Sequence, residues 1–118
     1  MATRQEEDIL VAQLQKGERK EEAFSKLVAL YKERLYWHVR NMVKNHEDAN
    51  DVLQNTFIKI FRYINNFKGD SKLYSWMYRI ATNESITFIN KKANNDDVLR
   101  DEMLQYILLL IQTKIHFV

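Results

Sequence analysis

The stretch FKGDSKLYSWMYRIATNESITFINKK, residues 67–92, joins a polar turn to a long helical pattern. Gly69 is one of only two glycines in the chain, and it can take the backbone angles that a tight turn requires. Ser71 is a suitable N-cap for the helix that follows. The apolar residues of that helix recur at helical spacing and predict a buried face made of Leu73, Trp76, Met77 and Ile80.

The remaining faces of this helix carry aromatic, amide and cationic side chains. Such groups stack on bases, read base edges and contact phosphates in nucleic-acid complexes. Residues 71–92 contain four cations and one anion, so the segment is locally basic. Because single exposed residues of these kinds occur on most helices, composition alone leaves a solvated surface as the alternative. The residues concerned are Tyr74, Tyr78, Arg79, Asn83 and Lys91.

The rest of the sequence also predicts helices. Proline is absent, and Gly17 and Gly69 lie between the apolar-periodic segments. Residues 3–6 have the form of a capping box, which predicts a first helix over Arg4–Lys16 with Gly17 as its stop. Apolar residues at steps of three and four, from Phe24 to Met42, predict the second helix.

A third helix is predicted after a polar interruption at residues 45–47. Asp48 and Asp51 indicate its start, because negative charge there meets the positive end of the helix dipole. Its buried stripe is expected to be Leu53, Phe57, Ile60, Phe61 and Ile64. With the fourth helix at residues 71–92 and no strand-like alternation, the chain is predicted to be an all-α, compact bundle of about four helices.

Composition narrows the functional classes. The 118 residues suffice for one small domain, which we place at residues 1–93, followed by a linker and helical tail at 94–118. The net charge of +2 argues against a globally basic nucleic-acid binder. The absence of cysteine removes disulfides and thiolate chemistry and suits the cytoplasm. No signal peptide is evident, and the longest apolar run, residues 106–111, is too short to span a membrane.

The sequence shows no catalytic or metal-ligand pattern. His38, His46 and His116 form no HExxH pair, no Glu-x-x-His di-iron pattern and no recognisable triad. The acidic pairs lie near predicted helix starts, where capping explains them. We therefore predict that the protein is not an enzyme and uses no metal or cofactor.

Two motifs in the chain closely resemble the extracytoplasmic-function sigma factors of bacterial RNA polymerase. FKGDS at residues 67–71, followed by YSWMYRIATN at residues 74–83, is similar to their promoter-reading segment. DANDVLQNTF at residues 48–57 is similar to the segment that docks on the clamp helices of the largest polymerase subunit. The resemblance runs from about Asp8 to Lys92 and implies the fold of sigma-factor region 2.

The resemblance implies a pocket formed by residues 67–71 and the start of the fourth helix. That pocket would accept a base flipped from the non-template strand of the −10 element, with Phe67 either stacking on it or packing in the core. Asn83 would read a base edge, and Arg79 would contact a phosphate. The implied DNA-binding residues are Phe67, Lys68, Gly69, Asp70, Ser71, Lys72, Tyr78, Arg79, Asn83 and Lys91.

The resemblance also implies a polymerase-binding face on the third helix. On physical grounds alone, a capped and solvated helix face is the better explanation of the acidic residues in its first turn. A polar and partly acidic face nevertheless suits a basic coiled-coil partner. The implied polymerase-binding residues are Asp48, Asp51, Gln54, Asn55 and Arg62.

The end of the chain departs from this family. A complete member continues into a helix-turn-helix domain that reads the −35 element, for which the chain has no room. Residues 94–97 are expected to break the helix before a final apolar helix within residues 96–118. That helix either packs on the bundle, pairs with a second copy to form a homodimer, or is the remnant of a truncated gene.

Two functions follow. The first is an initiation module that binds core RNA polymerase and recognises promoter −10 DNA as a single strand. The alternative is a protein-interaction module that binds the polymerase clamp helices or an anti-sigma factor without starting transcription.

Overall fold

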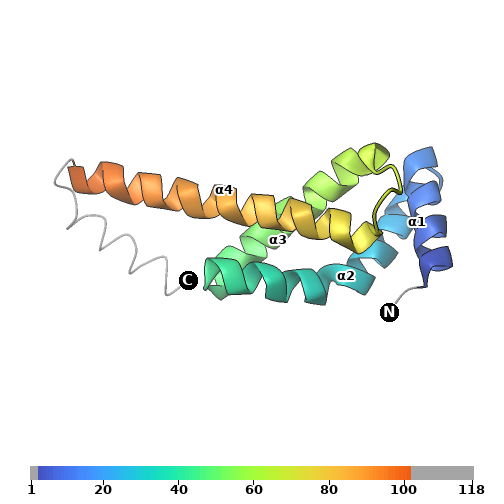
Figure 1. Cartoon of the computed structure of the whole chain (residues 1–118), viewed down its shortest axis with the longest axis horizontal. Coiled ribbons are helices and arrows are strands. Elements are labelled where there is room, and N and C mark those ends of the chain that lie inside the picture. The colour runs from blue at the N-terminus through green and yellow to red at the C-terminus, as the bar shows by residue number, and fades with distance from the viewer. Residues whose placement is uncertain (1–2, 102–118) are drawn as a thin grey trace. The chain divides into compact units, whose positions relative to one another are not determined.

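The computed structural model describes the backbone of residues 3–101 and the side chains of residues 3–93. The described part contains four α-helices and one 3₁₀ turn and has no strand, which confirms the predicted all-α bundle. The elements, in the order of Figure 1, are α1 (Arg4–Lys16), α2 (Lys20–Val43), α3 (His46–Tyr63), η1 (Ile64–Asn66) and α4 (Leu73–Asp101). The predicted apolar tail helix, and its pairing with a second copy, lie outside the described residues.

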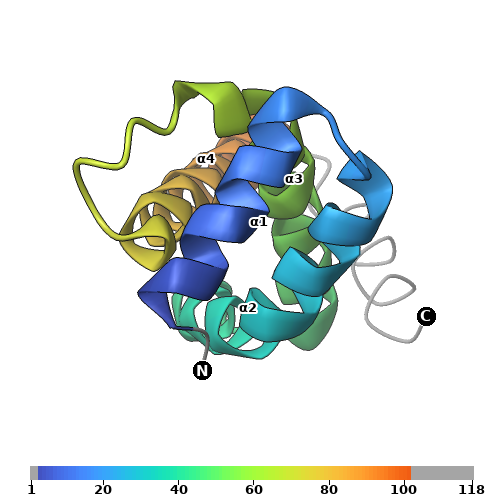
Figure 2. The ribbon, with the colours of Figure 1, turned by 90° about the vertical axis from the view of Figure 1, so that its right-hand side faces the viewer.

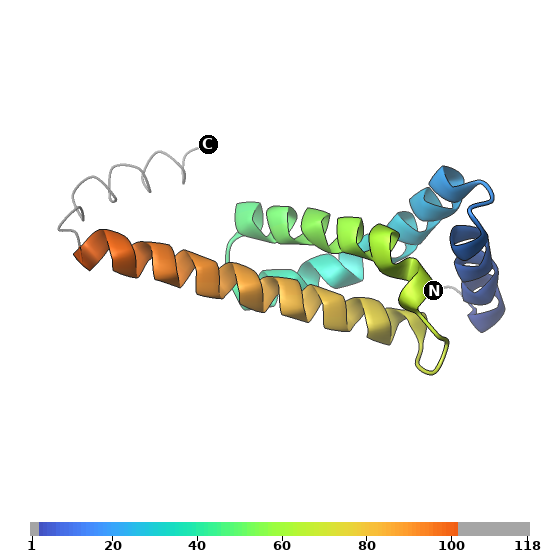
Figure 3. The ribbon, with the colours of Figure 1, turned by 90° about the horizontal axis from the view of Figure 1, so that it is seen from above.

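Residues 1–86 form one compact unit, and residues 87–118 are a second one. Within the first unit, α1 lies across the end of the bundle where α2 begins, α3 ends and α4 begins (Figures 2 and 3). In the part of the chain described here, no helix is long and apolar enough to cross a membrane.

Local capping determines the limits of α1. The Thr3 hydroxyl accepts a hydrogen bond of 3.1 Å from the Glu6 amide, as the capping box predicts. At the other end, Gly17 adopts a left-handed conformation with φ of 78°, and its N–H donates to the carbonyl of Gln13. The predicted bounds Arg4–Lys16 are confirmed.

The start of α3 is two residues earlier than predicted. Asn45 is the N-cap, because its side-chain oxygen accepts a 3.0 Å hydrogen bond from the Asp48 amide. The prediction of a start at Asp48 was therefore wrong, although negative charge does occupy the first turn. Leu53 and Phe61 of the predicted stripe are only half-buried. The buried residues of α3 are Ala49, Val52, Thr56, Phe57 and Ile60.

The core is built from residues that repeat every four positions. On α2 the buried residues are Ala23, Leu27, Tyr31, Leu35 and Val39. On α4 they include Leu73, Met77, Ala81 and Ser85. Spacing of four places each set in one row along its helix, the arrangement that lets helices interlock. A 2.6 Å ion pair between Lys59 and the largely buried carboxylate of Glu84 joins α3 to α4 at the edge of this core.

The first and last turns of α4 differ from the prediction. Ser71 is not an N-cap: its hydroxyl donates to the Lys72 carbonyl, and the same carbonyl accepts the first helical hydrogen bond from Trp76. The helix also continues through residues 94–97 to Asp101, so the predicted break was wrong. Asparagine and aspartate lower helix propensity, but they keep the backbone N–H that proline lacks.

Replacement of Met77 by alanine tests the assignment of the α4 faces. Met77 has an exposed fraction of 0% and Ile86 one of 45%. Met77→Ala is expected to lower the free energy of unfolding by about 2–5 kcal/mol, because it leaves a cavity in a packed core. Ile86→Ala is the control, with an expected loss below about 1 kcal/mol. Urea denaturation followed by circular dichroism measures both, and equal losses would contradict the assignment.

Candidate nucleic-acid interface

The loop of residues 67–72 connects η1 to α4 and carries the first part of the candidate site. Gly69 has a φ of 80°, which confirms that the turn needs its conformational freedom. No heavy atom lies within 4 Å of where a Cβ would stand, so the requirement comes from the backbone and not from crowding. Phe67 is only 9% exposed, and its ring centroid lies 5.5 Å from that of Trp76. The Phe67 ring thus packs in the core.

A pocket of about 450 Å³ opens beside this loop. This volume falls in the range of roughly 300–1,000 Å³ typical of small-molecule sites. Its rim carries both signs of charge, so it offers hydrogen-bond donors as well as acceptors to a ligand. The lining residues are Arg4, Glu7, Asp8 and Val11 from α1, Arg34 from α2, Phe67, Gly69, Ser71 and Lys72 from the loop, and Leu73, Tyr74 and Ser75 from α4.

An aromatic cluster holds the side chain of Tyr74, which forms part of the pocket wall, in place. The Tyr74 ring stacks on Tyr31, with centroids 6.0 Å apart, and the Arg34 guanidinium lies 3.8 Å from its centre. The Tyr31 hydroxyl donates a hydrogen bond to the Glu7 carboxylate. Burial raises the pKa of Tyr31 above its ordinary value, and the hydrogen bond and charge of Glu7 raise it further. Tyr31 therefore stays neutral and holds Glu7 in place.

The outward face of α4 continues from this wall. Tyr78 is 42% exposed, and its ring stacks on His38 of α2 at 3.7 Å between centroids. Thr82 donates its hydroxyl proton to the Tyr78 carbonyl, so the 2.7 Å bond between Thr82 and His38 is one in which the imidazole Nε2–H donates. Asn83 and Arg79 are exposed next to this pair. The result is a rigid stacking surface beside an amide and a guanidinium.

The cations of this surface are available to a ligand. Among the residues whose side chains are described, Lys68, Lys72 and Arg79 are exposed and make no ion pair within the protein. Asp70 and Ser71 complete the loop. Lys91 is also exposed and belongs to the second unit, residues 87–118.

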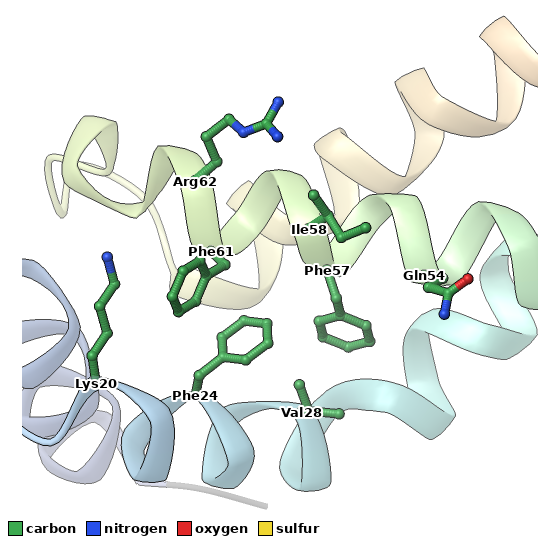
Figure 4. Close-up of a pocket in the computed structure, with 8 residues that line it drawn as sticks. All are labelled: Lys20, Phe24, Val28, Gln54, Phe57, Ile58, Phe61 and Arg62. Atoms are coloured by element: carbon green, nitrogen blue, oxygen red, sulfur yellow. The ribbon is translucent and has the colours of Figure 1, made fainter.

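The polar face of α3 forms a second surface. Asp51, Gln54, Asn55 and Arg62 are exposed, whereas Asp48 is half-buried beside the helix start. Sequence reasoning missed an apolar groove of about 710 Å³ that adjoins this face (Figure 4). The sequence feature that could have indicated the groove is Ile58, an apolar residue outside the predicted buried stripe. In the structure, Ile58 is 49% exposed. The groove is lined by Lys20, Phe24, Val28, Gln54, Phe57, Ile58, Phe61 and Arg62.

Aromatic rings form the floor of this groove. Phe24 contacts Phe61 and Phe57 edge to face, with centroids 5.0 and 6.2 Å apart. The Lys20 ammonium lies 4.3 Å from the centre of the Phe61 ring. Figure 4 shows Gln54 at one end of the groove and Lys20 with Arg62 toward the other. The described residues contain no group of histidine and acidic side chains able to hold a metal ion.

Comparison with known proteins matches residues 27–95 to the family model described as Sigma-70 region 2. The sigma-H factor of Pseudomonas aeruginosa is 39% identical over 83 residues, which cover 70% of this chain and 42% of that protein. The ECF sigma-E factor of Haemophilus influenzae is 33% identical over 109 residues, covering 90% of this chain and 56% of that protein. The chain thus spans about half the length of these relatives.

Two solved structures are similar in fold. An engineered region 2 of sigmaE, solved by NMR in complex with GTAAAA, aligns with a TM-score of 0.68 and 32% identity over 74% of this chain and 88% of that one. CnrH, solved in complex with the cytosolic domain of CnrY, aligns with a TM-score of 0.61 and 28% identity over 78% of this chain and 59% of that one.

The burial of His38 predicts a pH-dependent stability. Burial lowers the pKa of His38, so the folded state binds fewer protons at this site than the unfolded state. The stability associated with neutral His38 is therefore present above the unfolded pKa of about 6.5 and is lost as the pH falls from there through the lower pKa of the folded state.

His38→Phe can retain the ring stack on Tyr78 but cannot be protonated. We therefore expect its free energy of unfolding to fall less than that of the parent between about pH 7.5 and 5. Urea denaturation of both proteins across this range measures the difference, in which the other titrating groups cancel. Parallel pH profiles would show that His38 is protonated equally well in both states.

Proposed function

Because this chain belongs to the sigma-70 region 2 family, we propose that it is a transcription-initiation module that binds core RNA polymerase and recognises the promoter −10 element as a non-template single strand. The observation that carries the proposal is the pocket beside residues 67–72, which adjoins the exposed face of Tyr78, Arg79 and Asn83. A similar fold, the engineered sigmaE region 2, binds GTAAAA. The module comprises residues 1–93.

The pocket and the exposed face of α4 bind different parts of the strand. A base that leaves the stack enters the pocket, where the charged rim can hydrogen-bond its edge and offset the cost of unstacking. The Asn83 amide reads a neighbouring base edge, and Tyr78 offers a ring for stacking. Lys68, Lys72 and Arg79 contact phosphates and fix the register of the strand. Gly69, Asp70 and Ser71 shape the loop, and Phe67 supports it from the core.

The polar face of α3 is the proposed contact with the polymerase clamp helices. Asp51 supplies negative charge, and the Gln54 amide both donates and accepts hydrogen bonds. Asn55 and Arg62 extend this face on the exposed side of the helix, and Asp48 borders it at the helix start. Action on bacterial RNA polymerase implies a cytoplasmic protein, and the module carries out no catalysis of its own.

An anti-sigma factor is a second proposed partner. The similar structure of CnrH was solved in complex with the cytosolic domain of CnrY. In this chain the apolar groove next to Gln54 and Arg62 offers an aromatic floor to an amphipathic segment. A protein bound there would cover part of the polymerase-binding face, so the two partners would compete.

Binding to single strands tests the DNA-reading role. Fluorescence anisotropy at low salt is expected to show a preference for a strand containing GTAAAA, or another −10 motif from a panel, over scrambled strands. Asn83→Ala should relax this preference, because the amide reads a base, while Arg79→Ala should weaken binding to all strands alike. Added salt should lower every affinity and leave the preference in place. Equal affinity of the parent for every strand would refute this role.

Substitutions on α3 test the polymerase contact. Asp51→Ala and Gln54→Ala are each expected to weaken binding to core RNA polymerase by about 1–2 kcal/mol, because each removes a polar contact at an interface. Glu33→Ala is the matched control, since Glu33 is exposed on α2 and lines neither the groove nor the base pocket. Titration with labelled polymerase measures the three affinities. Unchanged affinities for both α3 variants would rule out this face.

A further inference from the structure

The side chain of Gln15, in the last turn of α1, joins two distant parts of the chain. Its amide nitrogen donates one hydrogen bond of 2.9 Å to the Ile64 carbonyl and another of 3.0 Å to the Phe67 carbonyl. These acceptors stand at the start of η1 and at the first residue of the 67–72 loop. Both amide protons of Gln15 are therefore used to hold the beginning of that loop.

The segment that Gln15 contacts, residues 64–67, also contains a hydrogen bond of its own. The Phe67 N–H donates to the Ile64 carbonyl at 3.1 Å, so this oxygen accepts from Phe67 and from Gln15 at the same time. A carbonyl oxygen has two lone pairs and can satisfy both donors. Gln15 thus bridges the two ends of a four-residue turn and fixes its distance from α1.

The same helix supplies the opposite wall of the base pocket. Arg4, Glu7, Asp8 and Val11 of α1 line the pocket facing Gly69, Ser71 and Lys72 of the loop. Arg4, Asp8, Val11 and Gln15 follow one another at steps of three and four, which places them along one side of α1. One wall of the pocket and the side chain that holds the other wall therefore belong to one rigid element.

We propose that Gln15 is a positioning residue for single-strand recognition, which sets the shape of the base pocket by fixing the 67–72 loop against α1. The inference rests on the proposed DNA-reading function. Gln15 and the pocket residues of α1 lie before residues 27–95, the part of the chain that matches the family model. Recognition of the strand accordingly depends on a helix outside the matched region.

Gln15→Glu is the first test, because it keeps the shape of the side chain and removes both donors. Gln13→Glu is its matched control: it makes the same change of charge on the same helix, at a half-buried side chain with no hydrogen bond among the described residues. Gln15→Glu is expected to lower the ratio of affinities for the preferred and scrambled strands by roughly two- to tenfold, the factor that corresponds to the net loss of one hydrogen bond between the displaced loop and the strand.

Three further measurements distinguish positioning of the loop by Gln15 from a general loss of structure. Affinity for core RNA polymerase and helical circular dichroism should match those of Gln13→Glu. Gln15→Met, which removes the donors without placing a carboxylate near two carbonyl oxygens, should lower the same ratio. An unchanged ratio in both Gln15 variants would overturn the proposal, and so would a parallel loss of strand and polymerase binding.

Trp76 provides a test that needs no DNA. It packs against Phe67, and in a Trp37→Phe background it is the only tryptophan in the chain. Acrylamide is expected to quench its fluorescence more strongly in Gln15→Glu than in Gln13→Glu, because the loop loses its tie to α1. Equal quenching would overturn the proposal. If the parent shows no strand preference, the DNA-reading function fails, and quenching alone still decides whether Gln15 holds the loop.

Discussion

The buried row of α4 is the constraint on which the rest of this molecule depends. Leu73, Met77, Ala81 and Ser85 lie on one side of a single rigid helix and are almost completely removed from water. Because an α-helix has a fixed rotation per residue, burial of this row determines which residues point outward. Tyr78, Arg79 and Asn83 are exposed for that reason, and the face that we propose binds a strand follows from the packing of the face opposite. The small side chains of Ala81 and Ser85 leave room for close approach to the core.

Aromatic and cation–π contacts then fix the orientations of the α4 side chains that burial alone would leave free. The Tyr78 ring stacks on His38, and the Tyr74 ring stacks on Tyr31 and also contacts the Arg34 guanidinium. All three partners come from α2, so the aromatic surface of α4 is set by a neighbouring helix. Stacking surfaces that are already ordered lose less entropy when a base binds to them. The proposed DNA face is thus largely formed before any strand arrives, and the loop is tied to α1 in the same way.

The two proposed binding faces differ in character. The α4 face combines exposed cations with aromatic and amide groups, which suits a charged and flexible strand. The α3 face is polar and partly acidic and borders a groove with an aromatic floor, which suits a protein surface. Because the chain carries a net charge of only +2, this separation of charge matters more than its sum. A chain that spans about half the length of its relatives can present both faces, since each is formed within the first 86 residues.

The sequence by itself determined the features that depend only on residues close together along the chain. Thr3 and Gly17 delimit α1 through hydrogen bonds within a single turn, Gly69 marks a turn through its own backbone, and the motifs identified the family. Only the tertiary structure decided that Phe67 is buried and that the pocket beside residues 67–72 has α1 as its second wall. Which side of a helix is buried depends on the neighbours against which it packs. Gln15 meets its partners 49 and 52 residues away, a separation at which no local pattern reveals contact.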